Sequence, residues 1–411
     1  MFDKDYLMSD NALARVFDAL STKYPEKEIS GLEAAYDRVL AQDIISKEDL
    51  PGFDRSTVDG YAVASSDTFG AKETMPAYLQ MSHEVFMGDE PDFTLAKGAA
   101  AKIPTGGMLP KGADAVVMLE HVQDAAGGLI EVLRSVSLYE NVIRRGDDIT
   151  ASSLVLDKGR RLKPQDVGAL AGIGITEVEV FKQPVVSIIS TGDEIVPASE
   201  SLKPGQIRDI NSYTLSGLIR RHGGMPKRMG IFKDDYNTIR NAMASALAES
   251  DMVLLTGGTS AGTKDMTSEI INDIGSPGVL FHGVSIKPGK PMIGAVVNNT
   301  AVFGLPGHPA ATVVCFNIFI KPVLRRICGM LDNTVESGTV RAVMSKSIAS
   351  AAGREDHIRV SLELKGGVLY AAPVLGKSGL ITTLVKADGI VIIPGPKLGL
   401  QAGEETIVRM F

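Results

Sequence analysis

Four short loops combine glycine or proline with residue types that bind anions or metal ions. They are TGDE at 191–194, TGGTSAG at 256–262, KPGKP at 287–291 and LPGHP at 305–309. The small residues of the second loop are Gly257, Gly258, Ser260 and Gly262. A Gly-rich loop between a strand and a helix exposes backbone N–H groups to a phosphate. This one is neither a Walker A loop, because Lys264 does not follow the last glycine directly, nor a dinucleotide-binding GxGxxG. By itself, a tight turn explains it equally well.

Charged side chains in and beside these loops extend the chemistry. Lys287 and Lys290 are separated by Pro288 and Gly289, so both ammonium groups can meet an anion from a stiffened backbone. Three acidic residues lie close to loop starts, namely Glu194, Asp234 and Asp265. Carboxylates beside phosphate-binding groups suggest Mg²⁺ bridging phosphate oxygens. Each acid taken separately is more simply a solvated charge. Their recurrence at predicted strand ends favours a nucleotide-like or phosphorylated ligand.

Three polar turns lie earlier in the chain. The stretch 54–61 contains Asp59, the stretch 103–107 contains Thr105 and the stretch 144–148 ends at Asp148. Each of them alone is more simply a solvated turn than a site.

The region that must position the four loops alternates apolar strands, loops and helices between 183 and 326. Strands are predicted at 185–189, 252–255 and 301–303, and Asn211 is placed to cap the first helix. Continuous apolar strands separated by helices predict a mostly parallel sheet that is covered on both faces. Ligands in such sheets bind at the carboxyl ends of the strands.

The flanking regions follow different patterns. Residues 9–20 predict an amphipathic helix capped by Ser9, and 50–145 predicts a β-rich module. A helix within 159–174 is expected to return and pack beside the N-terminal helix, which makes the β-rich module an insertion. After 329 the pattern is purely β, with apolar alternation over 358–364 and a hairpin turn at 366–367.

Composition excludes several classes of protein. The chain has 411 residues, 44% of them hydrophobic, which is too apolar for a disordered chain. A net charge of -7 lacks the basic excess of a non-specific nucleic-acid binder. Two cysteines, Cys315 and Cys328, rule out a disulfide scaffold, and no Cys/His spacing suits zinc. The start lacks an apolar signal core, and the apolar run 309–320 is too short to span a bilayer. We expect a cytoplasmic protein with neither nucleic-acid nor membrane partners.

The motifs taken together resemble a known family. They are FDRSTVDGYA at 53–62, TG at 105–106, RRGDD at 144–148, STGDE at 190–194, GQIRD at 205–209, GGTSAG at 257–262, KPGKP at 287–291 and LPG at 305–307. The ordered set resembles the molybdopterin molybdenumtransferase (MoeA) family, which includes the E domain of gephyrin, and it covers nearly the whole chain.

The resemblance implies a multidomain α/β plus β architecture. Its parts would be an elongated dimerisation domain (1–48 and 149–181), an inserted β-rich domain (49–148), an adenylyltransferase-like α/β domain that binds molybdopterin (182–328) and a C-terminal β-barrel-like domain (329–411). It also implies a homodimer in which the α/β domain of one chain and the inserted domain of the other share each active site.

The implied reaction converts adenylyl-molybdopterin and molybdate into molybdenum cofactor and AMP with the help of Mg²⁺. Tungstate has the same charge and nearly the same size as molybdate, so residue types do not separate the two. The positions implied to be catalytic are Asp59, Thr105, Asp148, Glu194, Asp234 and Asp265. Those implied to bind the metal are Glu194, Asp234 and Asp265. Those implied to bind substrate are Gly257, Gly258, Ser260, Gly262, Lys287, Lys290, Pro306, Pro309, Arg354 and Ser378.

The chain departs from the family pattern at two positions near these loops. His308 stands where asparagine is common, and Gly283 stands where some members have lysine. Two other functions stay open. A stand-alone molybdopterin adenylyltransferase is disfavoured by the additional domains, and a non-catalytic gephyrin-like scaffold is disfavoured by the intact set of acids.

Overall fold

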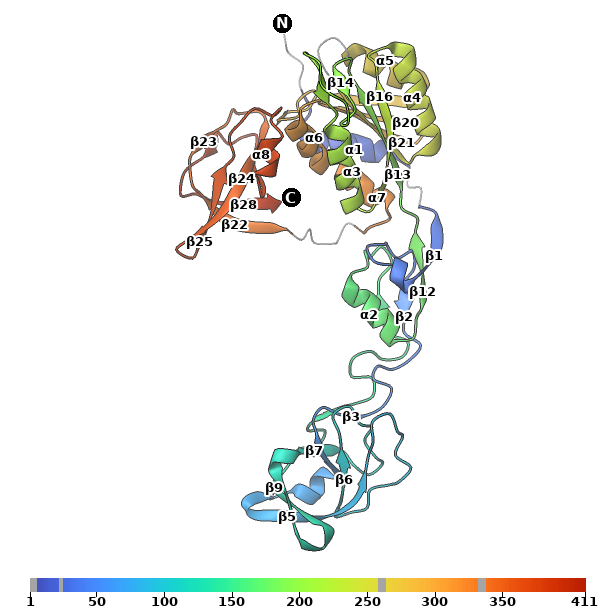
Figure 1. The fold of residues 1–411 in the computed structure, drawn as a ribbon, viewed down its shortest axis with the longest axis vertical. Helices are drawn as coiled ribbons and strands as arrows, with labels where there is room; N and C mark the ends of the chain where they lie inside the picture. The colour runs from blue at the N-terminus through green and yellow to red at the C-terminus, as the bar shows by residue number, and fades with distance from the viewer. Residues whose placement is uncertain (1–5, 22–24, 258–263, 332–337) are drawn as a thin grey trace.

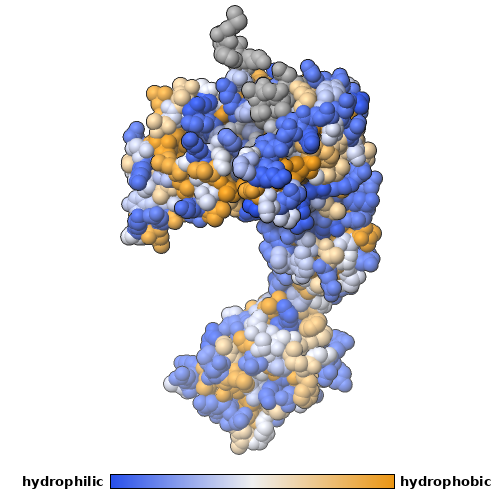
Figure 2. Space-filling model, turned by 45° about the horizontal axis from the view of Figure 1, so that its top comes forward, coloured by the Kyte–Doolittle hydropathy of each residue, from blue (hydrophilic) through white to orange (hydrophobic). Residues whose placement is uncertain are grey.

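Residues 6–21, 25–257, 264–331 and 338–411 are described by the computed structural model of the chain. Figure 1 shows an elongated molecule with a large body at one end and a smaller β-rich region at the other. A narrow stalk joins the two. In the space-filling view of Figure 2, a wide open space separates the body from the β-rich region on one side of the stalk.

The large body contains a six-stranded sheet of order β16-β13-β17-β21-β20-β18. Its strands are β13 (Val185–Thr191), β16 (Met225–Phe232), β17 (Met252–Thr256), β18 (Pro277–His282), β20 (Ile293–Val297) and β21 (Thr300–Leu305). The first four in sheet order are parallel, and β20 and β18 add an antiparallel edge. The prediction of a mostly parallel sheet is therefore confirmed.

Helices cover both faces of this sheet. They are α3 (Asn211–Arg221), α4 (Tyr236–Glu249), α5 (Lys264–Ile274), α6 (Pro309–Cys315) and α7 (Lys321–Ile327), with a π-helical turn, η5 (Phe316–Ile320), between the last two. Helices α4 and α5 cover one face of the sheet and pack against strand residues such as Val253. Helices α3, α6 and α7 cover the other face of the sheet and pack against strand residues such as Leu254. Alternate strand residues therefore enter different cores, as a two-sided sheet requires.

The N-terminal helix α1 (Ser9–Ala19) corrects one expectation. It packs in the core of the large body, where Ala12 and Val16 are completely buried. The returning helix α2 (Pro164–Gly172) instead buries Leu170 in the stalk, so the two helices do not pair. The apolar face of α1 packs against aromatic side chains of the body, such as Phe319.

Both predicted helix caps were wrong, and for the same reason. The Ser9 hydroxyl donates a hydrogen bond to Glu355, at 3.0 Å, and Met8 occupies the cap position. The Asn211 amide donates to the carbonyl of Gly307, at 2.8 Å, while the carboxylate of Asp209 accepts from the backbone of Ser212 at the start of α3. In each case a tertiary contact competes successfully for the polar side chain.

The stalk is built from two separate stretches of chain. Antiparallel pairs join β1 (Lys27–Gly31) to β12 (Glu177–Phe181) and β2 (Ile44–Ile45) to β11 (Leu154–Leu156). A core of its own supports them, together with the short helix η1 (Leu32–Ala34).

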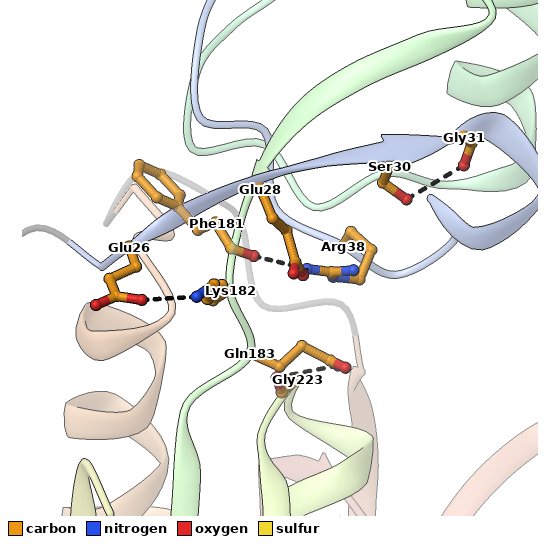
Figure 3. Close-up of polar contacts among 9 residues, drawn as sticks. All are labelled: Glu26, Glu28, Ser30, Gly31, Arg38, Phe181, Lys182, Gln183 and Gly223. Carbon is orange, nitrogen blue, oxygen red and sulfur yellow. Dashed lines mark hydrogen bonds and ion pairs between the residues drawn. The ribbon is translucent and has the colours of Figure 1, made fainter.

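Polar contacts of the stalk cluster where it meets the body (Figure 3). The Arg38 guanidinium contacts Glu28 and donates to the carbonyl of Phe181, at 3.0 Å. Lys182 pairs with Glu26 at 2.7 Å, and the Gln183 amide reaches the carbonyl of Gly223 in the body at 3.3 Å. The Lys182–Glu26 pair is exposed and adds little stability. Apolar side chains of the stalk, such as Phe181, also enter the apolar core of the body at this joint.

The inserted region is a six-stranded sheet of order β7-β4-β6-β5-β9-β8. Its strands are β4 (Gly60–Val63), β5 (Lys72–Glu84), β6 (Ala99–Ile103), β7 (Ala115–Met118), β8 (Val122–Asp124) and β9 (Leu129–Arg134), with β3 (Arg55–Ser56) paired to β10 (Val142–Ile143). Three short helices, η2 (Ser65–Thr68), η3 (Leu119–His121) and η4 (Ala126–Gly128), connect them. The predicted β-rich module is thus present, with apolar clusters on two faces.

The C-terminal region closes into a barrel because β24 pairs with both β25 and β26. Its strands are β22 (Thr339–Met344), β24 (Glu355–Lys365), β25 (Val368–Pro373), β26 (Gly389–Ile393) and β28 (Glu405–Met410), and β23 (Ile348–Ala349) pairs with β27 (Gly399–Leu400). The hairpin is confirmed, with Lys365 opposite Val368. The expectation of pure β structure was wrong at α8 (Thr382–Val385).

The described ranges contain no helix that is both long enough and apolar enough to cross a membrane.

His222, at the end of α3, makes the stability of the fold depend on pH. Its ring lies 5.7 Å from that of Phe316, centroid to centroid. Burial, followed by the charges of Lys321 and Arg221, lowers the pKa of His222 from 6.5 to about 4. The unfolded chain therefore binds an extra proton as the pH falls from 6.5 through 4. We expect the free energy of unfolding to be fully retained above this window and to decrease within it.

Thermal melts at about pH 7 and about pH 5 check this expectation. Replacing His222 with asparagine is expected to reduce the loss of Tm between the two conditions. The matched control, His83→Asn, removes an exposed histidine and should melt with the same pH dependence as the native chain. A His222→Asn protein with the native pH dependence would contradict the assignment.

Candidate functional site

The carboxyl ends of the four parallel strands lie side by side at one edge of the sheet. The backbone N–H of Gly192, after β13, donates to the carbonyl of Phe232 at the end of β16, at 3.2 Å. The N–H of Gly257, after β17, donates to the carbonyl of Leu305 at the end of β21, at 3.4 Å. The loops predicted to bind ligand are therefore neighbours.

The close approach of two backbone segments requires glycine at position 257, whether or not a ligand binds there. Its φ is +104°, and an added Cβ would lie 2.0 Å from the carbonyl oxygen of Thr191. Only glycine allows the β13 and β17 loops to approach this closely. Gly258, Ser260 and Gly262 of the same loop lie outside the described residues.

Two of the three predicted metal-binding acids come together beyond β13 and β16. Desolvation raises the pKa of the Asp234 carboxyl, and the negative charges of Asp193 and Glu194 raise it further, while a hydrogen bond from Thr191 opposes them. Gly192 gives the Glu194 carboxylate room to fold back, since a Cβ there would lie 2.8 Å from Oε2. Negative charge therefore accumulates at this point. The side chain of Asp265, at the start of α5, is not among those described.

The lysine turn lies at the junction between the body and the barrel. Strand β19 (Ile286–Lys287) pairs in parallel with β24, which places Lys287 opposite Asp356. A cavity of about 780 Å³ opens between the turn and the barrel. Five predicted substrate-binding residues line it, namely Lys287, Lys290, Pro306, Arg354 and Ser378.

The lining of this junction cavity is strongly cationic. The described part of the lining contains five Lys and Arg side chains, namely Lys287, Lys290, Arg354, Arg359 and Lys377. Among the described lining residues the single carboxylate is Asp356, whose side chain is almost completely buried and pairs with Arg354 at 2.8 Å. A net positive cavity in a chain of net charge -7 is a local feature suited to an anion.

The 305–309 loop links the sheet edge to this cavity. Pro309 begins α6 and is buried, and the carbonyl of Pro306 accepts a hydrogen bond from Thr312 at 2.8 Å. His308 Nδ1 lies 2.8 Å from the Ser378 hydroxyl. The departure from the family pattern at position 308 therefore places an imidazole on a predicted substrate-binding serine.

Sequence reasoning missed Arg359. The alternation of apolar residues along 358–364 assigned it to the solvent side, yet it is only 8% exposed because the segment 374–378 covers it. Its Nη2 donates to the carbonyl of Gly376 at 2.9 Å, and its buried Nε has no hydrogen-bond partner. Burial lowers the pKa of the guanidinium. The sequence offered no local signal, because Arg359 stands at a polar position of the alternation. At the other end of the strand, Leu364, expected on the buried side, is exposed.

Asp59 and Thr105 form a second cluster, in the inserted region. The backbone N–H and the hydroxyl of Thr105 both donate to Asp59 Oδ1, at 2.8 and 3.1 Å. The backbone bond, followed by the hydroxyl, lowers the pKa of the Asp59 carboxyl. Asp148 is exposed at the base of the region, where its N–H donates to Leu50. Within one chain, Figure 1 shows the inserted region far from the sheet edge.

Asp59 borders an apolar hollow of about 390 Å³. Phe86, Met87 and Leu119 line it and are 61%, 62% and 43% exposed. A cluster of exposed apolar side chains is a feature of surfaces that contact another molecule.

Among the side chains that the structure describes, no group of three or more His, Cys, Asp or Glu is arranged to hold a metal ion.

The fold and these sites define a multidomain protein with a ligand-binding α/β sheet edge and a cationic cavity against a β-barrel. Comparison with known sequences agrees along most of the chain. Residues 7–174 match the family described as MoeA N-terminal region (domain I and II), 187–326 the probable molybdopterin binding domain, and 341–409 the MoeA C-terminal region (domain IV).

Individual relatives match nearly end to end. A putative molybdopterin biosynthesis protein of Methanocaldococcus jannaschii is 37% identical over 402 residues, covering 95% of this chain and 94% of that protein. The molybdopterin molybdenumtransferase of Bacillus subtilis is 33% identical and covers 95% and 91%. The structure of a molybdopterin biosynthesis MoeA protein from Pyrococcus horikoshii superposes with a TM-score of 0.85 at 33% identity, covering 99% and 100%. The chain belongs to the MoeA family.

Proposed function

We propose that this protein is a molybdenum-inserting transferase, which converts adenylyl-molybdopterin and molybdate into molybdenum cofactor and AMP. The phosphoanhydride bond of the substrate is cleaved with uptake of water and AMP leaves. The two dithiolene sulfurs bind molybdenum in place of two molybdate oxygens, which take up protons and leave as water. The observation that carries the proposal is the cationic junction cavity, placed beside the carboxyl edge of the sheet in a MoeA-family chain.

The cavity suits the oxyanion. Molybdate carries two negative charges, and the ammonium groups of Lys287 and Lys290 and the guanidinium of Arg354 can oppose them. Holding molybdate next to the substrate supplies proximity. Tungstate fits the same description.

The acidic end of the edge suits the phosphate side of the substrate. Burial raises the pKa of Asp234, and repulsion from Asp193 and Glu194 raises it further. A cation beside Glu194 would relieve that repulsion, and carboxylate oxygens are the ligands that Mg²⁺ prefers. Glu194 and Asp234, with Asp265, are the residues that would hold it. Bound there, Mg²⁺ would neutralise charge that develops on the cleaved phosphate.

We also propose that two chains share each site. The inserted region, which carries Asp59, Thr105 and Asp148, lies far from the large body within one chain (Figure 1), while the hollow beside Asp59 exposes apolar side chains suited to a contact. Contact between the inserted domain of one chain and the α/β domain of its partner would complete the site. The four domain ranges 1–48 with 149–181, 49–148, 182–328 and 329–411 belong to this proposal. So does a cytoplasmic location, which the buried free thiols of Cys315 and Cys328 support.

The test is AMP release from adenylyl-molybdopterin with and without molybdate. We expect AMP and molybdenum cofactor to form together, in equal amounts, only when molybdate is present. Sulfate, which has the same charge but is smaller, serves as the control anion and should not replace molybdate. Equal AMP release in all three conditions, or no release with molybdate, would contradict the proposal. In a parallel assay with molybdopterin and ATP, net adenylylation with release of pyrophosphate would instead indicate the adenylyltransferase, and activity in neither assay would indicate the scaffold.

A further inference from the structure

Tyr6, just before α1, reaches the rim of the junction cavity. Its ring lies under the ammonium of Lys290, with Nζ 4.3 Å from the ring centroid. A cation over an aromatic face at this distance is attracted by the ring quadrupole. The ring therefore touches one of the cationic groups that face the proposed oxyanion.

The backbone fixes the position of this ring. The carbonyl of Tyr6 accepts from the Ser285 hydroxyl at 3.1 Å, and the carbonyl of Leu7 accepts from the Ser285 N–H at 2.9 Å. The carbonyl of Ser285 in turn accepts from the N–H of Glu355 in β24, at 2.9 Å. The segment before α1 is thus tied to the lysine turn and, through it, to the barrel.

Gly283 leaves the space that the ring fills. A Cβ at this position would lie 2.3 Å from Cε1 of Tyr6, so no other residue allows the ring to lie here without displacement. The backbone of Lys290 borders the same space: its carbonyl oxygen would lie 3.5 Å from that Cβ and accepts from the N–H of Val284 at 2.9 Å. Among the described residues, Lys290 forms no ion pair with a carboxylate, and the ring is what orients its ammonium.

The geometry points to Tyr6 as a positioning residue for oxyanion binding, one that holds the Lys290 ammonium ready at the cavity wall. A free lysine side chain loses rotamer freedom when it binds an anion. A ring that already restrains the ammonium before the anion binds reduces this loss of rotamer entropy. Such restraint before binding is called preorganisation. The inference rests on the proposed function, because it names a residue that acts on the same anion site.

The experiment measures molybdate binding by calorimetry in the full-length protein. Tyr6→Phe keeps the ring and is expected to bind as the native chain does. Tyr6→Leu keeps apolar volume over Gly283 but has no π face, and its dissociation constant is expected to rise about two- to fivefold. In turnover assays the KM for molybdate should rise by the same factor while kcat stays unchanged. A simple loss of folding would not produce this split.

A double-mutant cycle separates positioning from packing. With Lys290→Ala as the background, Tyr6→Leu is expected to cause no further change. Native affinity in Tyr6→Leu, or an equal loss in both backgrounds, would overturn the inference while leaving the proposed function intact. Native affinity in Lys290→Ala would instead remove the lysine turn from the anion site, and the inference would fall together with that part of the proposed function.

Discussion

Replacing Glu194 with glutamine is expected to lower molybdate-dependent AMP release by about 10²-fold or more. The carboxylate lies beside Asp234, whose pKa its charge helps to raise. Glutamine keeps the shape of the side chain and removes that charge. If this end of the sheet edge neutralises the phosphate through a cation, the loss falls on the chemical step. Steady-state kinetics should therefore show a lower kcat, with the KM for molybdate changed much less.

The fold should not change in this variant, because Glu194 is exposed and follows a strand instead of filling a core. Thermal melts of the native and variant chains check this. The matched control is Glu269→Gln, which removes an exposed carboxylate from helix α5 of the same domain and should keep native turnover. Near-native kcat in Glu194→Gln would contradict the prediction and would indicate that Glu194 is a solvated charge on a loop.

The sheet and its ligand edge could be predicted because local patterns determine them. Residues such as Val253 and Leu254 face opposite cores, so the strand must be apolar throughout. Three of the parallel strands, β13, β17 and β21, are followed directly by Gly192, Gly257 and Pro306, and parallel pairing brings those ends to one edge. The barrel hairpin was equally local, since the turn at 366–367 needs only its two glycines.

What the sequence could not determine were the partners of individual side chains. The apolar face of α1 is compatible with several surfaces, and nothing local selects the body over the stalk. Ser9 has the chemistry of a helix cap but meets Glu355, which is distant in sequence. Arg359 alternates like a surface residue and is buried by a loop that closes over it. In all these cases a tertiary contact outweighs a local preference.

Mixing two inactive variants is expected to restore activity if two chains share each site. One variant carries Asp59→Asn in the inserted region, and the other carries Glu194→Gln at the sheet edge. In a mixed dimer, one site combines the intact Asp59 of one chain with the intact Glu194 of its partner, and the other site carries both changes. Random association makes half of the dimers mixed, so an equal mixture should recover about a quarter of native AMP release.

The matched control pairs Glu194→Gln with Asp234→Asn. Both changes lie on the same sheet edge, next to each other, so every site in a mixed dimer has one defect and the mixture should stay inactive. Recovery in the first mixture alone would assign Asp59 and Glu194 to different chains of one site. If the first mixture also stays inactive after subunit exchange has been verified by mass spectrometry, each chain supplies both groups to its own site. The inserted region would then have to swing across the open space seen in Figure 2 to reach its own sheet edge.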